Sequence, residues 1–237
     1  MSRSANAQYN LAAPDSLAIR TANRVRYAMF DQFLRAFTPG EDDLVLDIGV
    51  TSDQEYESSN YFEALYPHKH RITAAGIDDA RFLEKLYPGV RFEFADALNL
   101  PFKDRSFDYV HSSAVLEHVG SFANQRKMVC ECARVARKGL FLTTPNRWFP
   151  VEFHTQLPLL HWLPKPLFRN ILVKLGQTEL AREENLNLMT GRELRRAASD
   201  IEGWRFISAK ARLLGLTSNL ILLGHRADEN IPTRHQP

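Results

Sequence analysis

The sequence predicts an α/β fold in which the strands of a parallel sheet alternate with helices. Between residues 44 and 144, short apolar runs typical of strands are separated by helical stretches. That alternation favours parallel strands joined by right-handed crossovers. In addition, three of the runs each end beside an acid, namely Asp47, Asp78 and Asp96. Because ligands bind at the carboxyl ends of parallel strands, these acids predict a binding crevice there.

The first element is predicted to be a helix within an N-terminal helical segment, residues 1–40. Residues 14–16, Pro-Asp-Ser, suit a helix start, and apolar residues then recur at spacings near three and four from Val25 to Phe37. Residues 38–40, Thr-Pro-Gly, are expected to end the helix. Its arginines fit a solvent-exposed face, although they could also meet an anionic substrate. They are Arg20, Arg24, Arg26 and Arg35.

The sheet is predicted to contain five parallel strands followed by a hairpin. The five strands are expected at 44–48, 72–77, 90–95, 107–112 and 140–144. Helices are expected to separate them, for example at 60–65, 80–86 and 123–136. Two further strands, 204–211 and 219–224, stand so close together that a hairpin suits them. We expect the tail, 228–237, to be disordered.

The composition indicates one globular domain over residues 1–237. Of these residues, 44% are hydrophobic and 24% are charged, which suits one buried core with an insertion. Lysine and arginine number 30 and the acids 28, and this balance gives no indication of a nucleic-acid partner. The sequence gives no basis for an oligomeric state.

Cysteine usage and hydropathy favour a cytoplasmic protein. The two cysteines, Cys130 and Cys132, stand close together on a predicted helix and so point to different sides. They suit neither a disulfide nor a zinc site, and we expect a reducing compartment and no metal. No window approaches the roughly 20 apolar residues that span a bilayer, and the first residues lack the apolar core of a signal peptide.

Several segments together resemble a known family. They are 44–49 (LVLDIG), 77–78 (ID), 95–97 (ADA), 100–110 (LPFKDRSFDYV) and 116–118 (LEH). Over roughly residues 40–145, the chain is similar to class I S-adenosylmethionine-dependent methyltransferases of the methyltransferase-11 type. The resemblance implies a three-layer, Rossmann-like sheet of seven strands in the order 3-2-1-4-5-7-6, with the seventh antiparallel. It also implies S-adenosyl-L-methionine as the cofactor.

By this resemblance, the cofactor lies along the ends of the first three strands. Asp47 would help to hold the methionine amino group, and Gly49 would let the backbone approach the cofactor closely. Asp78, with Asp79 as a near substitute, would accept hydrogen bonds from the two ribose hydroxyls, although a capping role for Asp78 is the alternative. Asp96 would face the adenine amine, and the small Ala97 leaves room for the ring.

The first loop departs from the family, because Val50–Tyr56 replaces the usual glycine-rich continuation. β-Branched Val50 and Thr51 resist a positive φ angle, so we expect the loop to cross the cofactor by another path. Thr51 or Ser52 would then offer a hydroxyl. Ser113, where the fourth strand ends, is also counted among the cofactor-binding residues.

Methyl transfer is an in-line displacement, so alignment of the acceptor with the methyl carbon should carry most of the catalysis. If the acceptor must lose a proton, a base would add on the order of 10² to 10⁴ in rate. The candidates are His118, His154 and Glu117, of which the two histidines are preferred. The alternatives are a turn cap for His118 and a structural role for His154. The Asn/Asp-Pro-Pro-aromatic signature of nucleobase and glutamine methylation is missing at 112–114, which favours O-, C- or simple N-methylation of a small acceptor.

An insertion, residues 146–202, follows the fifth strand and is rich in Pro, Leu and Trp. Because it begins at the carboxyl end of that strand, it is expected to form a lid that excludes water and shapes the acceptor pocket. A packed helical subdomain is the alternative. The apolar residues of 156–175 could touch a membrane surface or a lipid-linked acceptor, or they could form a core.

Two other functions are compatible with parts of the sequence. The altered loop could have lost the cofactor, which would leave a binding or scaffold protein on the same fold. A NAD-dependent oxidoreductase would share the alternating architecture, but such enzymes need Gly-x-Gly-x-x-Gly at the first turn. Here Asp53 and Glu55 stand where phosphate would bind. A methyltransferase is therefore the leading hypothesis.

Overall fold

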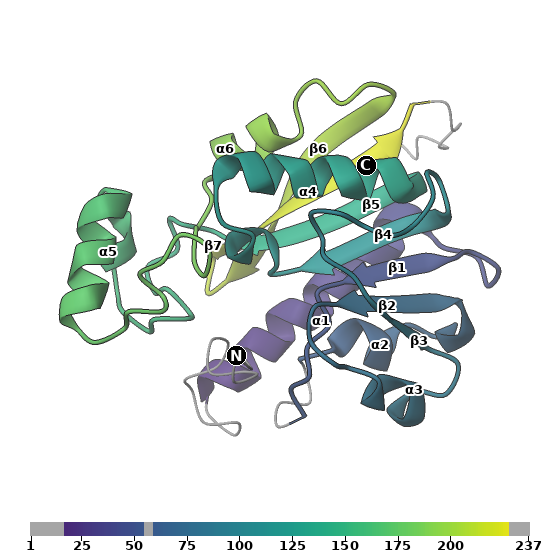
Figure 1. Cartoon of the computed structure of the whole chain (residues 1–237), viewed down its shortest axis with the longest axis horizontal. Coiled ribbons are helices and arrows are strands. Elements are labelled where there is room, and N and C mark those ends of the chain that lie inside the picture. The colour runs from purple at the N-terminus through teal and green to yellow at the C-terminus, as the bar shows by residue number, and fades with distance from the viewer. Residues whose placement is uncertain (1–16, 55–58, 228–237) are drawn as a thin grey trace.

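Seven strands form one sheet in the computed structural model, which describes residues 17–54 and 59–227 (Figure 1). Their order is β3-β2-β1-β4-β5-β7-β6. β7 is antiparallel to both of its neighbours, and the other pairs are parallel. The predicted strand order is therefore confirmed. The strands are β1 (Val45–Ile48), β2 (Ile72–Gly76), β3 (Arg91–Phe94), β4 (Phe107–Ser113), β5 (Ala136–Pro145), β6 (Trp204–Leu213) and β7 (Leu216–Arg226).

Helices cover both faces of the sheet, as the three-layer prediction requires. In Figure 1, α4 and α6 lie over one face, and α1, α2 and α3 lie over the other. The α-helices are α1 (Leu17–Phe37), α2 (Tyr61–Leu65), α3 (Phe82–Leu86), α4 (Phe122–Val135), α5 (Lys165–Lys174) and α6 (Gly191–Ala197). The connections contain the short 3₁₀ helices η1 (Lys69–Arg71), η2 (Leu116–His118) and η3 (Leu160–Trp162).

Side chains alternate along β1 and so join two different cores. Leu46 and Ile48 pack in the core on the α4 side of the sheet, whereas Val45 packs in the core on the α1 side. All four residues of β1 are buried, as expected for a parallel strand with helices on both faces. The alternation also decides which way the polar residue of this strand, Asp47, must point.

Phe33 fixes α1 to the sheet. Its side chain is fully buried and makes edge-to-face contacts with Phe62 of α2 and Phe141 of β5, at ring-centroid distances of 5.2 and 5.8 Å. Each pair of this kind contributes about 0.5–1.5 kcal/mol beyond its buried area. The apolar spacing from Val25 to Phe37 is therefore the stripe by which α1 packs on the domain.

The insertion divides into two parts. Its last part belongs to the main domain, because Leu194 and Ala197 of α6 pack in the same core as α4. Its earlier part has a small core of its own, and α5 lies beside the sheet instead of across it (Figure 1). That small core consists of Phe168, Leu172, Leu180, Ala181, Leu186 and Leu188. A packed subdomain therefore accounts for much of the insertion.

Among residues 17–54 and 59–227, no helix is long and apolar enough to cross a membrane. Cys132 is buried, Cys130 is half-buried, and both thiols are free. The tail predicted to be disordered, 228–237, lies outside the described residues. So do the expected helix start at 14–16 and residues 55–56 of the altered loop.

Candidate active site

A cavity of about 370 Å³ opens at the carboxyl ends of β1, β2, β3 and β4. Its volume falls within the range of ligand pockets, about 300–1,000 Å³. Every site residue expected from the sequence lines this cavity except Asp47 and the alternative candidates Ser52, Asp79 and Glu117. The lining residues among them are Gly49, Thr51, Asp78, Asp96, Ala97, Ser113, His118 and His154.

Glycine is required at position 49 because of the backbone angle there and because of the nearby Val115 side chain. Its φ angle is 100°, and a Cβ atom built on it would overlap Cγ2 of Val115. After Gly49 the backbone no longer needs glycine, since none of residues 50–54 has a positive φ angle. That behaviour agrees with the expectation from the β-branched residues of this loop.

Asn60 shapes the loop that replaces the glycine-rich segment. Its side-chain oxygen accepts from the Thr51 N–H at 2.9 Å, and its side-chain amide donates to the Thr51 carbonyl at 3.1 Å. The Thr51 hydroxyl accepts from the Asp53 N–H at 3.3 Å, and the Asp53 carboxylate accepts from the Ser59 hydroxyl. Side chains therefore hold the loop in place, with Thr51 and Asp53 on the cavity wall.

The two acids that follow β2 have different surroundings. Asp79 accepts from the Arg81 N–H at 3.1 Å and pairs with the Arg81 guanidinium at 3.0 Å, just before α3. Asp78 lines the cavity instead. After β3, Asp96 also lines the cavity, and one of its oxygens accepts from the Leu98 N–H at 2.8 Å. Acids at the ends of neighbouring strands thus share one wall of the cavity.

Asp47 does not line the cavity. Because side chains alternate along β1, its carboxylate turns toward α2, where it bonds to Nδ1 of His111 at 2.5 Å. Burial raises the pKa of Asp47 to about 7. Burial, and then the charge of Asp47, raise the pKa of the fully buried Glu63. We expect these two carboxyl groups to share one proton in the core.

His111 connects Asp47 to the cavity wall. Burial lowers the pKa of His111 to about 3, so its ring is neutral. With Nδ1 donating to Asp47, Nε2 accepts from the Tyr61 hydroxyl at 3.2 Å. Tyr61 interacts in turn with Ser113, which lines the cavity. Asp47 therefore supports the wall from behind, through a chain of buried hydrogen bonds.

Arg26 is a cavity residue to which the sequence gave no function. It shares a face of α1 with Phe30 and Phe33, which are four and seven residues further on, and it reaches the cavity. Burial lowers the pKa of Arg26, while Tyr61 and Asp53 oppose that shift. The signal in the sequence was the position of this arginine on the buried stripe of the helix.

His118 and His154 meet where η2 and the insertion form the cavity wall. Their Nε2 atoms are 3.1 Å apart, and their rings are nearly perpendicular, at 84°. Nδ1 of His118 bonds to the Asn185 carbonyl at 2.6 Å. Nδ1 of His154 bonds to the Glu152 carboxylate at 2.7 Å. The fold therefore brings together two histidines that stand 36 residues apart.

Burial strongly perturbs the charges around this pair. It lowers the pKa of His118 to about 3 and raises the pKa of the neighbouring Glu117 to about 7. Burial also lowers the pKa of His154, but the Glu152 carboxylate outweighs this and the net pKa is raised. Although burial opposes the shift, His154 holds the pKa of Glu152 down to about 2. A cluster of perturbed groups in a cavity is typical of a functional site.

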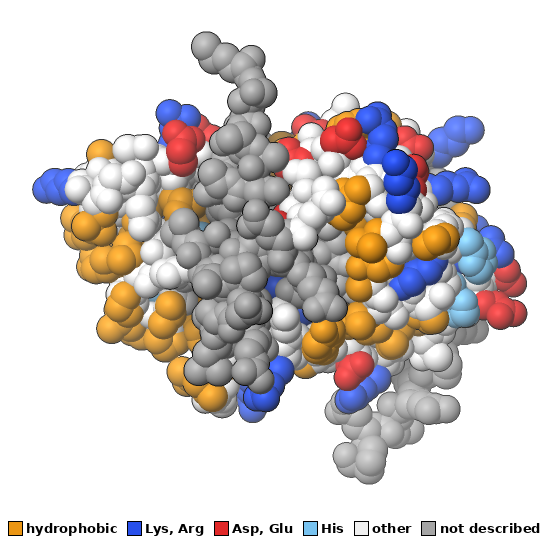
Figure 2. Space-filling view, turned by 90° about the horizontal axis from the view of Figure 1, so that it is seen from below, with side chains coloured by type: hydrophobic (Ala, Val, Ile, Leu, Met, Phe, Trp, Pro, Cys, Tyr) orange, Lys and Arg blue, Asp and Glu red, His pale blue; other side chains and the backbone are white. Residues whose placement is uncertain are grey.

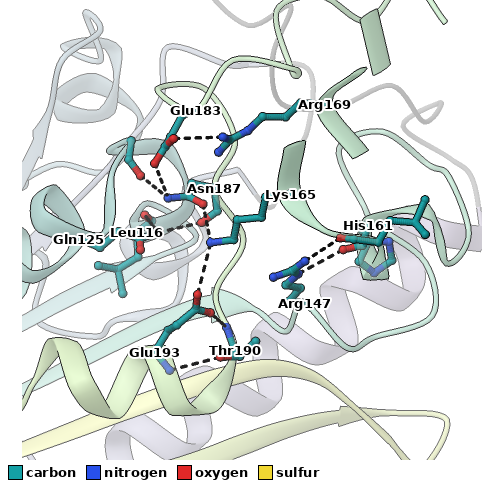
Figure 3. Close-up of polar contacts among 12 residues, drawn as sticks. Leu116, Gln125, Arg147, His161, Lys165, Arg169, Glu183, Asn187, Thr190 and Glu193 are labelled. Carbon is teal, nitrogen blue, oxygen red and sulfur yellow. Dashed lines mark hydrogen bonds and ion pairs between the residues drawn. The ribbon is translucent and has the colours of Figure 1, made fainter. Parts of the chain in front are cut away.

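Figure 3 shows how the insertion is held against the core. Lys165 donates to the Asn187 side chain at 2.8 Å and pairs with Glu193 of α6 at 3.4 Å. Gln125 of α4 donates to the Asn187 carbonyl at 2.8 Å. The Asn187 N–H donates to the Glu117 carbonyl at 2.7 Å. The segment that carries Asn185 is thereby fixed beside η2.

Arg147, near the start of the insertion, bonds within that insertion. Its guanidinium donates to the His161 carbonyl at 3.2 Å and to the Leu163 carbonyl at 2.8 Å (Figure 3). It also lies over the Trp148 ring, 5.5 Å from the centroid. These contacts tie the start of the insertion to the segment that precedes α5.

The comparisons with known proteins agree with this geometry. A profile of the methyltransferase domain family matches residues 58–143, and no curated protein matches the sequence. Magnesium protoporphyrin IX methyltransferase from Synechocystis PCC 6803, solved with bound SAH, aligns with a TM-score of 0.52 and 17% identity, covering 88% of this chain and 84% of that one. Geranyl diphosphate C-methyltransferase from Streptomyces coelicolor A3(2) aligns with a TM-score of 0.59 and 13% identity, covering 92% and 88%.

At these identities the solved structures show the fold, while the profile match shows the domain. The matched residues run from before β2 into β5 and include Asp78, Asp96 and His118 of the cavity. The match therefore favours the methyltransferase over the oxidoreductase alternative. Residues 58–143 thus match the methyltransferase domain profile, and the sheet has the strand order that the resemblance to class I methyltransferases implies.

Proposed function

We propose that the protein transfers the methyl group of S-adenosyl-L-methionine to a small-molecule acceptor bound in the same cavity. The observation behind the proposal is one cavity lined by Gly49, by the strand-end acids Asp78 and Asp96, and by the paired His118 and His154. The first three are the positions at which the resemblance puts the cofactor. The cavity therefore joins a cofactor cradle to polar groups able to hold an acceptor.

The adenosyl part of the cofactor would lie along the ends of β2 and β3. In this arrangement Asp78 accepts from the ribose hydroxyls, Asp96 accepts from the adenine amine, and Ala97 leaves room for the ring. At the methionine end, the cavity wall carries Thr51 and Arg26. The Arg26 guanidinium suits the methionine carboxylate.

The contribution of the protein to the reaction is positioning. When bound, S-adenosylmethionine supplies a methyl carbon whose bond to sulfur breaks, with the electron pair left on sulfur, as the acceptor atom bonds to it. The cavity walls hold the acceptor in line with that carbon. His118 and His154 present ring nitrogens to the reacting group of the acceptor, and a base role for either would add on the order of 10² to 10⁴ in rate.

An apolar acceptor, free or lipid-linked, is supported by the surface of the insertion. Figure 2 shows hydrophobic side chains gathered on the side of the molecule where α5 lies. In η3 and α5, the side chains of Trp162, Leu167 and Val173 are 41%, 48% and 53% exposed. Magnesium protoporphyrin IX and geranyl diphosphate, which name the two aligned methyltransferases, are partly apolar small molecules. O- or C-methylation of such a molecule, in the cytoplasm, is the reaction that we favour.

Incorporation of a labelled methyl group tests the proposal. The protein is incubated with methyl-labelled S-adenosylmethionine and fractionated small-molecule extracts, and the products are identified by mass spectrometry. We expect label in an organic product with the wild type and with the control Asp79→Ala, and none with Asp78→Ala. Equal labelling by Asp78→Ala would contradict the assigned cradle, and no labelled product from any fraction would count against the reaction.

A further inference from the structure

Three side-chain atoms converge at one place on the cavity wall. They belong to Glu117, His118 and His154, each of which offers one ligand atom within 4.8 Å of the other two. The two Nε2 atoms are 3.1 Å apart, and Glu117 Oε1 is 3.9 Å from the His118 Nε2. Because both histidines line the cavity, the cluster is open to a bound molecule.

The partners of the two Nδ1 atoms show that each ring carries a hydrogen on Nδ1. The Asn185 carbonyl can only accept, so His118 Nδ1 carries a hydrogen. The Glu152 carboxylate accepts from the N–H groups of His154 and Thr155 as well as from His154 Nδ1, which therefore carries a hydrogen too. In a neutral imidazole the other nitrogen is then an acceptor. When both rings are neutral, two lone pairs point into the same space, an arrangement that calls for a cation between them.

Glu117 adds a third donor to that space. Its side chain is fully buried, and Oε2 accepts from the Thr144 hydroxyl at 2.8 Å. Among residues 17–54 and 59–227, no hydrogen-bond partner is found for Oε1. Burying a carboxylate oxygen without a partner is costly. Its position beside two imidazoles therefore indicates a ligand.

We propose that Glu117, His118 and His154 bind a divalent transition-metal ion, for which Zn²⁺ is the reference. Two histidines and one glutamate are a ligand set of catalytic zinc sites, which keep one position open. Ligands about 2.1 Å from a tetrahedral ion stand about 3.4 Å apart. The 3.1 and 3.9 Å separations observed here lie on either side of that value. The nitrogen ligands disfavour Mg²⁺ and Ca²⁺, which prefer oxygen.

The outer contacts are those that metal-bound histidines make elsewhere. A ligating histidine donates its second N–H to a carboxylate or a backbone carbonyl, which orients the ring and strengthens the bond to the metal. Glu152 plays that part for His154, and the Asn185 carbonyl plays it for His118. A bound ion would contradict the expectation, drawn from the two cysteines, that the chain holds no metal.

The ion would add a mechanism to the proposed function. Binding of the ion does not depend on that function, but its role in the reaction rests on it. Since the site faces the cavity, an oxygen, nitrogen or sulfur atom of the acceptor can complete the coordination. The ion would hold that atom in place and favour its deprotonated form, with the proton released to solvent. It would take the place of the base role of the two histidines, whose Nε2 atoms would then be ligands. The acceptor class is then a small molecule with a hydroxyl, thiol or carboxylate at or next to the methylated position.

A proton is the competing occupant of this space. A protonated His154 would donate from Nε2 to His118 and join the rings without an ion. That arrangement leaves Oε1 of Glu117 without a partner, and it gives the cluster no affinity for metals. A measurement of metal binding therefore distinguishes a bound ion from a shared proton.

Cobalt titration provides the test. The full chain is stripped with a chelator and titrated with Co²⁺ while its visible absorption is recorded, and Zn²⁺ is then added as a competitor. We expect one equivalent of Co²⁺ to bind and Zn²⁺ to displace it. In Glu117→Gln and His154→Ala the dissociation constant should rise at least about tenfold, since losing even an outer partner weakens metal binding 10- to 100-fold. The matched control is His70→Ala, which removes an exposed histidine and should bind as the wild type does.

Glu117→Gln keeps the size of the side chain and an acceptor for Thr144, and circular dichroism would verify that it folds. No Co²⁺ binding by folded wild type, or equal binding by the two site variants, would overturn the proposal. S-adenosylhomocysteine is titrated into the same samples. Binding of S-adenosylhomocysteine without metal would reject the ion alone, whereas binding of metal without S-adenosylhomocysteine would support the ion and contradict the proposed methyl transfer.

Discussion

Replacing Gly49 by alanine tests the geometry of the first loop. Its φ angle of 100° lies in a region that costs an alanine on the order of 1–2 kcal/mol. The added Cβ would also overlap Cγ2 of Val115, and crowding of this kind costs about 1–3 kcal/mol. We therefore expect the free energy of unfolding to fall by about 2–5 kcal/mol. For a chain of this length, the Tm should fall by about 4–20 °C.

Two further variants separate the loss of stability caused by the backbone angle from the loss caused by the overlap with Val115. Both are measured by urea and thermal unfolding. Gly203 has a φ angle of 73° with no atom within 4 Å of a built Cβ, so Gly203→Ala should lose only the backbone part, about 1–2 kcal/mol. Adding Val115→Ala to Gly49→Ala removes the overlap and should recover about 1–3 kcal/mol, relative to Val115→Ala alone. A Gly49→Ala protein as stable as Gly203→Ala, with no recovery in the double variant, would refute this reasoning.

Three other results are expected. Burial raises the pKa of Asp108, but hydrogen bonds led by the Leu44 N–H outweigh it and lower the net pKa. Its contribution to stability is therefore present above the unfolded pKa of about 3.9 and is lost as the pH falls through the folded value, so Asp108→Asn should flatten urea stability profiles on the acid side. Arg147→Ala should speed limited proteolysis within 146–188, because two hydrogen bonds to the carbonyls before α5 are lost. If the acceptor is lipid-linked, Leu167→Ser with Val173→Ser should reduce cosedimentation with lipid vesicles without changing S-adenosylhomocysteine binding.

Strand positions could be predicted where apolar runs have clear ends. β1, β2 and β4 begin and end within one residue of the expected positions. β5 begins earlier than expected, at Ala136, because polar residues continue the strand: Arg137 pairs with Asp108 at 2.6 Å beside the sheet. The hairpin strands are also longer than expected. Pairing with a neighbouring strand fixes such polar extensions, and a pattern of apolar residues cannot show it.

The candidate site was partly readable, because acids at strand ends gather at one edge of a parallel sheet. Asp78 and Asp96 lie on the cavity wall for that reason. Asp47 stands one position earlier along its strand than a cavity-facing residue would, so alternation turns it into the core. The meeting of His154 with Glu117 depends on how the insertion folds back, and no local spacing predicts it.

Isothermal titration with S-adenosylhomocysteine is the most direct test of the cofactor cradle. We predict one site per chain, with a dissociation constant in the micromolar range. Asp78→Ala and Asp96→Ala should abolish measurable binding, since both remove carboxylates from the cavity wall, whereas Asp79→Ala should bind as the wild type does. Folded wild-type protein that binds no S-adenosylhomocysteine would contradict the cradle and favour a cofactor-free scaffold.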